Sequence, residues 1–90
     1  MTTTVTVDNR ASETASVVEV RAEDLVGQLH RITRALVECR LDVISARVST
    51  FGPAVVDAFY VRDEHGRKLT DPQVVARLEQ AVRARVATPG

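Results

Sequence analysis

The segment Asp24-Leu25-Val26-Gly27 carries the residues whose types and spacing best suit ligand binding. It lies between a segment typical of a strand and a segment typical of a helix. A glycine at a helix start lets a ligand approach the backbone. The first free N–H groups of the helix, at the positive end of its dipole, suit a carboxylate. Asp24 could then hold an ammonium group through a charge-assisted hydrogen bond. This chemistry fits an amino acid.

The same segment also fits purely structural roles. Gly27 could be a simple turn glycine, and Asp24 could cap the helix by accepting a hydrogen bond from a free amide. Leu25 and Val26 form an apolar pair in a loop, which is easier to explain if a ligand or a second subunit covers them. Both interpretations stay open at this point.

The other residues that could do chemistry favour structural roles. We expect His30 on the exposed side of a helix, His65 in a solvated turn and Cys39 as a small buried hydrophobe. Asp57 shares a strand face with apolar residues, and we expect it near the exposed end of that strand. One cysteine and two separated histidines give no metal-ligand spacing, and no catalytic triad or phosphate loop stands out. We therefore expect no metal, no cofactor and no catalysis.

Length and charge limit the class of protein. Ninety residues predict one domain, 1–90, with a core of about 4–86 and a frayed tail at 87–90. Lys and Arg number 12, and Asp and Glu also number 12, so the zero net charge argues against nucleic-acid or anionic-membrane partners. The N-terminus does not resemble a signal peptide, and no apolar run could span a membrane, so we expect a cytoplasmic location.

The elements that must position these residues follow from periodicity. Alternation predicts strands at 3–7 and 15–22, the second with Val18, Val20 and Ala22 on one face. The spacing of Leu29, Ile32 and further apolar residues predicts a helix over about 26–39, with Gln28 off its apolar stripe. Two β-branched segments, 41–50 and 53–63, flank a turn at Gly52-Pro53, and a second helix is predicted over about 72–86.

The predicted order is therefore β, β, α, β, β, α. Strands with one apolar face and helices with one apolar stripe must cover each other, which indicates an α+β sandwich of two layers. A four-stranded antiparallel sheet with two helices on one face is a ferredoxin-like layout. The order ββαββα is a permuted form of the usual βαββαβ.

The chain resembles ACT domains, in particular those of bacterial PII-protein uridylyltransferases. The segments that carry the resemblance are VDN, ITRAL, LDVISARVST, VVDAFYV and DEHGRKL, in this order, within residues 4–84. The resemblance implies a regulatory module that binds an amino acid and pairs with a second domain. Glutamine, in the control of nitrogen metabolism, is the first candidate ligand, and a catalytic domain in a longer parent chain is an implied partner.

The resemblance also implies where the ligand binds. Asp24 and Gly27 match the family's loop, but Leu25 and Val26 replace its usual arginine-proline pair. Asp42 matches a position that often faces the ligand's amino group, whereas Ala22 stands where one serine-sensing relative has a histidine. The implied site is Asp24, Leu25, Val26, Gly27, Gln28, Leu29, Asp42 and Val43.

Two other functions are possible. Loss of the arginine-proline pair could leave a ligand-free structural dimerisation module. A single-stranded RNA binder on the same type of sheet is disfavoured, because Phe51, Phe59 and Tyr60 are the chain's only aromatic residues. The predicted outer face of the sheet is polar, so we expect pairing through sheet edges or helices to give a homodimer.

Overall fold

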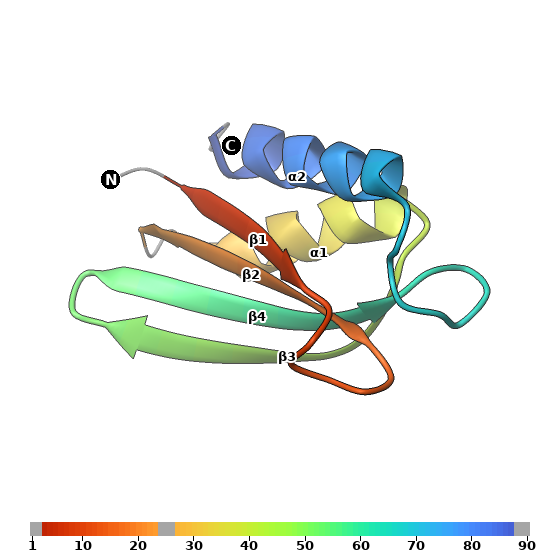
Figure 1. The fold of residues 1–90 in the computed structure, drawn as a ribbon. Coiled ribbons are helices and arrows are strands. Elements are labelled where there is room, and N and C mark those ends of the chain that lie inside the picture. The colour runs from red at the N-terminus through yellow and green to blue at the C-terminus, as the bar shows by residue number, and fades with distance from the viewer. Residues whose placement is uncertain (1–2, 24–26, 88–90) are drawn as a thin grey trace.

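The computed structural model describes residues 3–23 and 27–87 and contains four strands and two helices (Figure 1). The elements follow in the predicted order. They are β1 (Thr4–Asp8), β2 (Ser16–Glu23), α1 (Gln28–Glu38), β3 (Asp42–Phe51), β4 (Ala54–Arg62) and α2 (Pro72–Ala87). The tail at 88–90 lies outside the described residues.

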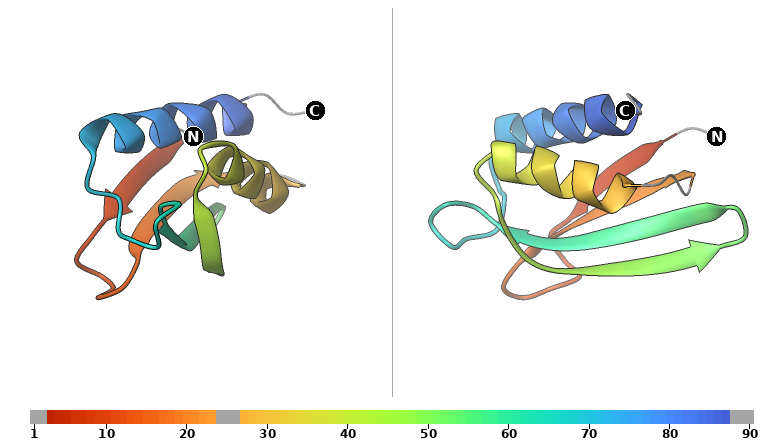
Figure 2. Two further views of the ribbon diagram at one scale, coloured as in Figure 1. Left: turned by 90° about the vertical axis from the view of Figure 1, so that its right-hand side faces the viewer. Right: turned by 180° about the vertical axis from the view of Figure 1, so that it is seen from behind.

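The strands form one antiparallel sheet in the order β1-β2-β4-β3. Both helices lie on the same side of this sheet, so the molecule has two layers (Figure 2). The predicted two-layer α+β sandwich, in the permuted ferredoxin-like order, is confirmed. β1 and β3 are the two edge strands.

The helix-facing side of the sheet is apolar because alternate residues of each strand point to it. Val18, Val20 and Ala22 of β2 are buried there, as the alternation predicts. Phe59 pairs with Val18 and is fully buried, with 0% of its surface exposed. Burial of such a side chain contributes roughly 1.5–3 kcal/mol relative to an exposed one.

The opposite side of the sheet is the polar face that the sequence predicts. The strand register places these side chains together: Glu19, Arg21, Ser45, Arg47, Ser49, Tyr60 and Arg62. The Arg21 guanidinium lies 5.8 Å from the centre of the Phe51 ring, within the range of a cation–π contact. This face therefore has its own cross-strand contacts and needs no further layer to cover it.

Helix α1 is rotated relative to the prediction. It begins at Gln28 and ends at Glu38, and its buried residues are Gln28, Ile32, Ala35 and Leu36. Leu29 was expected on the apolar stripe but is 44% exposed, whereas Gln28 was expected off the stripe and is buried. The buried positions recur at steps of three and four, so a single helical face runs through Gln28 and leaves Leu29 beside it.

The two helices also contact each other through charged side chains. Arg85 of α2 donates a hydrogen bond to the Glu38 carboxylate at the end of α1. This hydrogen bond lowers the pKa of Glu38. On α2, Leu78, Val82 and Val86 are buried, in agreement with the predicted stripe.

Helix α1 ends in a Schellman motif with an arginine at the left-handed position. The Arg40 N–H donates to the Val37 carbonyl at 2.9 Å, and the Leu41 N–H donates to the Leu36 carbonyl at 3.2 Å. Arg40 has φ 61°, a conformation in which glycine is the usual residue. The turn directs the chain from α1 into β3 and keeps Arg40 at the surface.

A cluster of hydrogen bonds around the buried Ser16 side chain holds the β1–β2 hairpin against the segment before α2. Ser16, with 0% exposure, donates to the Asn9 side-chain oxygen and accepts the Leu69 N–H at 2.8 Å. The Asn9 amide donates to the Leu69 carbonyl at 2.8 Å, and Lys68 donates to the Asn9 carbonyl at 2.8 Å. The VDN segment therefore has a structural role, because Asn9 connects residues far apart in the sequence.

Candidate functional site

The turn into α1 depends on the backbone freedom of Gly27. Gly27 is the N-cap of α1 with φ 77° and ψ 6°, a left-handed conformation that costs other residues about 1–2 kcal/mol. A Cβ added at this position would meet nothing within 4 Å. Within this chain, the glycine is therefore required by its conformation, and the space beside it is open.

Within residues 3–23 and 27–87, no side chain caps the first turn of α1. The N-cap makes no side-chain hydrogen bond, and the first turn holds no acidic residue. The first intrahelical bond runs from the Arg31 N–H to the Gly27 carbonyl at 3.0 Å. Because the earliest N–H groups of a helix have no partner within it, this end can accept an anionic group.

Gln28 is the unusual polar group at this helix end. Its side chain is 5% exposed, and its Oε1 atom is fully buried with no hydrogen-bond partner among the described residues. A buried acceptor without a donor costs about 1–3 kcal/mol. The resemblance places Gln28 in the binding loop, but nothing in the apolar pattern marks it as buried.

The structure describes only part of the predicted loop site. Asp24, Leu25 and Val26 lie outside the described residues, and so does any cap that Asp24 could supply. Leu29 is exposed on the first turn of α1, and His30 is exposed as predicted. Within the described chain, the loop site is therefore represented by Gly27, Gln28 and Leu29.

Asp42 and Val43 lie at the other end of the sheet. Asp42 pairs with Arg62 at the end of β4, whereas the loop follows Glu23, which pairs with Ala54 at the start of β4. The chain runs the length of α1 between the two places (Figure 1). One copy of the chain therefore does not bring Asp42 to the loop, and the predicted site is divided.

Asp57 is buried in the sheet. It shares the helix-facing side with Val55, Phe59 and Val61, as the alternation predicts, but it is only 3% exposed. The expectation that it lies near an exposed strand end is wrong. Its neighbours in the ladder, Val20 on β2 and Val48 on β3, place it within the sheet.

Exposed apolar side chains concentrate on α1 and β3. Among the described residues, the exposed large hydrophobic side chains are Leu29 (44%), Val37 (56%), Ile44 (44%), Val48 (53%) and Phe51 (56%). Val48 pairs with Asp57 and therefore points to the helix-facing side, where no helix covers it. An edge strand with unpaired backbone groups and uncovered apolar side chains is suited to pairing with another strand.

Three other features bear on function: possible metal ligands, possible membrane-spanning helices and the single cysteine. Across residues 3–23 and 27–87, no three of His, Cys, Asp and Glu come together in a group able to hold a metal ion. In the same residues, neither helix is long and apolar enough to cross a bilayer. Cys39 is half-buried against the core, and burial raises the pKa of its thiol.

The sheet order and the two helices on one side of the sheet define a ferredoxin-like α+β domain. Residues 11–88 match the family model described as the ACR family N-terminal ACT domain. The chain belongs to the ACT domain family, and ACT domains are regulatory modules. The resemblance drawn from the sequence segments is thereby confirmed.

The similar proteins include long enzymes. The chain is 43% identical over 82 residues to a bifunctional uridylyltransferase/uridylyl-removing enzyme of Rhodospirillum rubrum, covering 91% of this chain and 9% of the relative. It is 45% identical over 80 residues to the enzyme of the same description from Gluconobacter oxydans, covering 89% of this chain and 8% of that one. The chain therefore spans less than a tenth of the length of these relatives.

One solved structure supports the fold. The crystal structure of an unknown protein from Galdieria sulphuraria superposes with a TM-score of 0.52 and 26% sequence identity. The superposition covers 72% of this chain and 36% of that chain.

Proposed function

We propose that the chain is a sensor module that binds a free amino acid, glutamine being the first candidate, in the control of nitrogen metabolism by the uridylyltransferase system. The observation that carries this proposal comes from residues 3–23 and 27–87. Within them, the N-terminus of α1 follows the left-handed Gly27 and has no side-chain cap, and the buried Gln28 Oε1 beside it has no hydrogen-bond partner. The N–H groups of the first turn would bind the ligand's carboxylate. Gln28 Oε1 would accept a hydrogen bond from one of the ligand's N–H donors.

The ammonium group needs a carboxylate, and Asp24 or Asp42 would supply it. Leu25 and Val26 replace an arginine and a proline in this proposed site, which removes one partner for the ligand's carboxylate and one fixed backbone angle. We therefore expect weaker binding than in a domain that keeps the pair.

Pairing of two copies would complete the divided site. If the β3 strands of two copies pair antiparallel about a two-fold axis, the start of one strand lies beside the end of the other. Asp42 of a second copy would then lie near Phe51, at the end of the sheet where the loop begins, since Phe51 and Glu23 both pair with Ala54. The uncovered Val48 and Ile44 favour this homodimer, which would place a ligand at each end of the seam.

Calorimetric titration with the twenty amino acids tests the sensor proposal, and Gly27→Ala provides the sharpest variant. We expect glutamine to bind, and G27A to weaken binding by at least about tenfold, because alanine resists the left-handed turn that presents the N–H groups. Gly66→Ala is the matched control: Gly66 also has a positive φ of 76°, and a Cβ there also meets nothing within 4 Å.

The control separates loss of stability from loss of the site. Both variants should lose similar stability, but G66A should keep the wild-type affinity. If calorimetry detects no binding of any amino acid at millimolar concentration, the sensor proposal is refuted.

A ligand-free dimerisation module is the second candidate, favoured by the exposed apolar side chains on α1 and β3 together with the replaced pair. The double variant Leu25→Arg, Val26→Pro would restore the usual residues. If the module has lost its ligand in this way, the variant should gain amino-acid binding that the original chain lacks. Tight binding by the chain as it stands excludes this alternative.

A further inference from the structure

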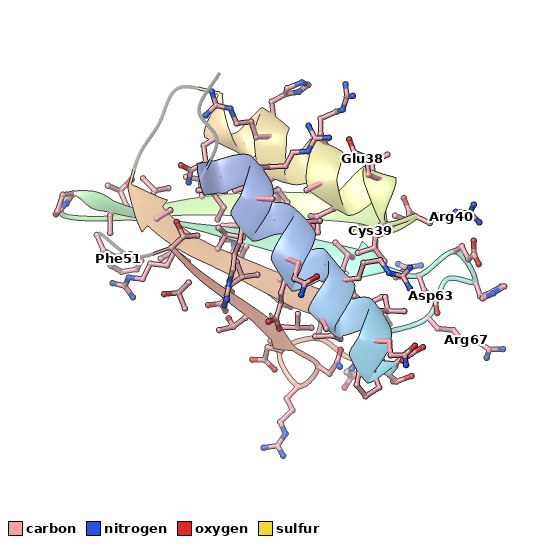
Figure 3. The ribbon with its side chains drawn as sticks, turned by 90° about the horizontal axis from the view of Figure 1, so that it is seen from above. Glu38, Cys39, Arg40, Phe51, Asp63 and Arg67 are labelled. Carbon is pink, nitrogen blue, oxygen red and sulfur yellow. The ribbon has the colours of Figure 1, made fainter. Side chains whose placement is uncertain are left out.

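A second place in the fold carries chemistry that the loop at Gly27 does not explain. A cleft of about 370 Å³ lies at the opposite end of α1, between the helix end, the segment after β4 and the first turns of α2. Figure 3 shows Cys39, Arg40 and Asp63 near one another at this end. The residues that line the cleft are Cys39, Arg40, Leu41, Asp63, Glu64, Val74 and Arg77.

Asp63 presents a fixed negative charge to the cleft. Its Oδ1 atom accepts the His65 N–H at 2.8 Å and the Arg67 N–H at 2.9 Å, and the Asp63 N–H donates to the Arg67 carbonyl at 2.7 Å. The backbone hydrogen bond from Arg67 is the main cause that lowers the pKa of Asp63, so this carboxyl stays ionised. Within residues 3–23 and 27–87, its second oxygen, Oδ2, has no hydrogen bond.

Arg77 supplies a positive charge on the α2 side of the same cleft. In the part of the chain that the structure describes, its guanidinium forms neither an ion pair nor a hydrogen bond. Arg40, also at the cleft, lies 4.0 Å from Glu64, and both of these side chains are largely exposed, so that pair is weak. Arg77 is therefore the cation available to a ligand.

The same cleft also has apolar lining residues, beside the charged Arg40 and Glu64. Leu41 is 6% exposed and belongs to the core, and Val74 is half-buried against it. Cys39 adds a thiol that burial keeps neutral, because its pKa is raised. A carboxylate, an apolar wall and a guanidinium together complement a small zwitterion with an aliphatic side chain.

We propose that this cleft is a second binding site, distinct from the loop at Gly27, for a small aliphatic α-amino acid. The ligand's carboxylate would pair with Arg77, its ammonium group would donate to Asp63 Oδ2, and its side chain would lie on Leu41 and Val74. Because Asp63 and Arg77 line one cleft and carry opposite charges, recognition favours a ligand that carries both charges of its own.

Cys39, the chain's single cysteine, provides a reporter at the cleft wall. The test measures the rate at which an aromatic disulfide reagent modifies the folded wild-type chain with L-leucine present. At a leucine concentration of twice Kd, the rate should fall about threefold, since only the unoccupied cleft reacts. Leucinamide, which lacks the carboxylate, and 4-methylpentanoate, which lacks the ammonium group, should protect much less.

Two variants decide the outcome. Arg77→Gln should abolish protection by leucine, whereas Arg83→Gln, an exposed arginine on the same helix that does not line the cleft, should keep it. Both substitutions are at exposed helix positions, and circular dichroism checks the fold. Unchanged reactivity with leucine, or full protection in R77Q, would overturn the proposal.

Amide chemical shifts separate this site from the loop site. Leucine should shift the amides of Cys39, Leu41 and Glu64 in the wild-type chain and equally in G27A, which disables only the loop. Glutamine binding at the loop should instead shift Gln28 and Leu29 and disappear in G27A. Leucine shifts confined to Gln28 and Leu29 would refute the second site and leave the loop site intact.

Discussion

Replacing Val48 with lysine is expected to abolish the proposed homodimer and leave the domain monomeric. Val48 is 53% exposed on the helix-facing side of edge strand β3, so the substitution should change the stability of the single copy by less than about 0.5 kcal/mol. In an antiparallel β3–β3 seam, however, two lysines would face each other and their charges would lose water. Sedimentation velocity at micromolar concentration measures the result.

Thr6→Lys is the matched control for V48K. Thr6 is exposed on β1, the other edge strand, and T6K introduces the same charge away from the proposed seam. T6K should remain a dimer. The amino-acid affinity of V48K should fall together with its dimerisation, because Asp42 of the second copy is removed from the loop. A wild-type chain that is a strict monomer, or a V48K chain that still dimerises, would contradict the proposed seam.

Replacing Ser16 with alanine is expected to lower the free energy of unfolding by roughly 2–3 kcal/mol. The hydroxyl is fully buried and makes two hydrogen bonds, one to Asn9 and one from the Leu69 N–H. Its removal leaves the Leu69 N–H without an acceptor at a buried place. Urea denaturation, followed by far-UV circular dichroism, gives the free energy directly.

A double-mutant cycle with Asn9→Ala tests whether these residues act as one cluster. Because Asn9 and Ser16 share a hydrogen bond, the effects of the two substitutions should not add. Ser45→Ala, on the exposed face of β3, should change stability by less than about 0.5 kcal/mol. Additive effects, or equal losses in S16A and S45A, would show that the cluster does not hold the hairpin.

Periodicity was enough to predict the order of the elements and the buried stripe of α2, but not the buried face of α1. The alternation of Val18, Val20 and Ala22 correctly predicts that they are buried on one face of β2, although Val17 on the other face is buried as well, and the stripe through Leu78 and Val82 orients α2. Gly52-Pro53 separates the two β-branched segments where the β3–β4 turn lies. These features are local, and local signals survive in a single sequence.

The candidate site was less predictable because it depends on packing and on strand direction. Gln28 and Leu29 are neighbours at the start of α1. Hydropathy predicts that Leu29 is buried, whereas the structure buries Gln28 and exposes Leu29. Asp57 is an acidic residue, a type that is rarely buried, yet its position in the alternation places it on the helix-facing side of the sheet. The separation of Asp42 from Gly27 could have been inferred from the helix between them, since each helical residue adds about 1.5 Å. The cleft beside Asp63 joins three distant segments, and no local pattern reveals it.

The irregularity at the start of β3 has a consequence for the proposed assembly. The register shift between Val43 and Ser45 interrupts the regular ladder, so the uniform stretch of this edge runs from Ser45 to Phe51, with Val48 at its centre. Two such stretches that pair antiparallel along their full length have a single alignment, in which Val48 meets its own counterpart. The irregularity within each chain would thus fix the register between the two β3 strands, because a shifted alignment would not pair the full length of the regular stretch.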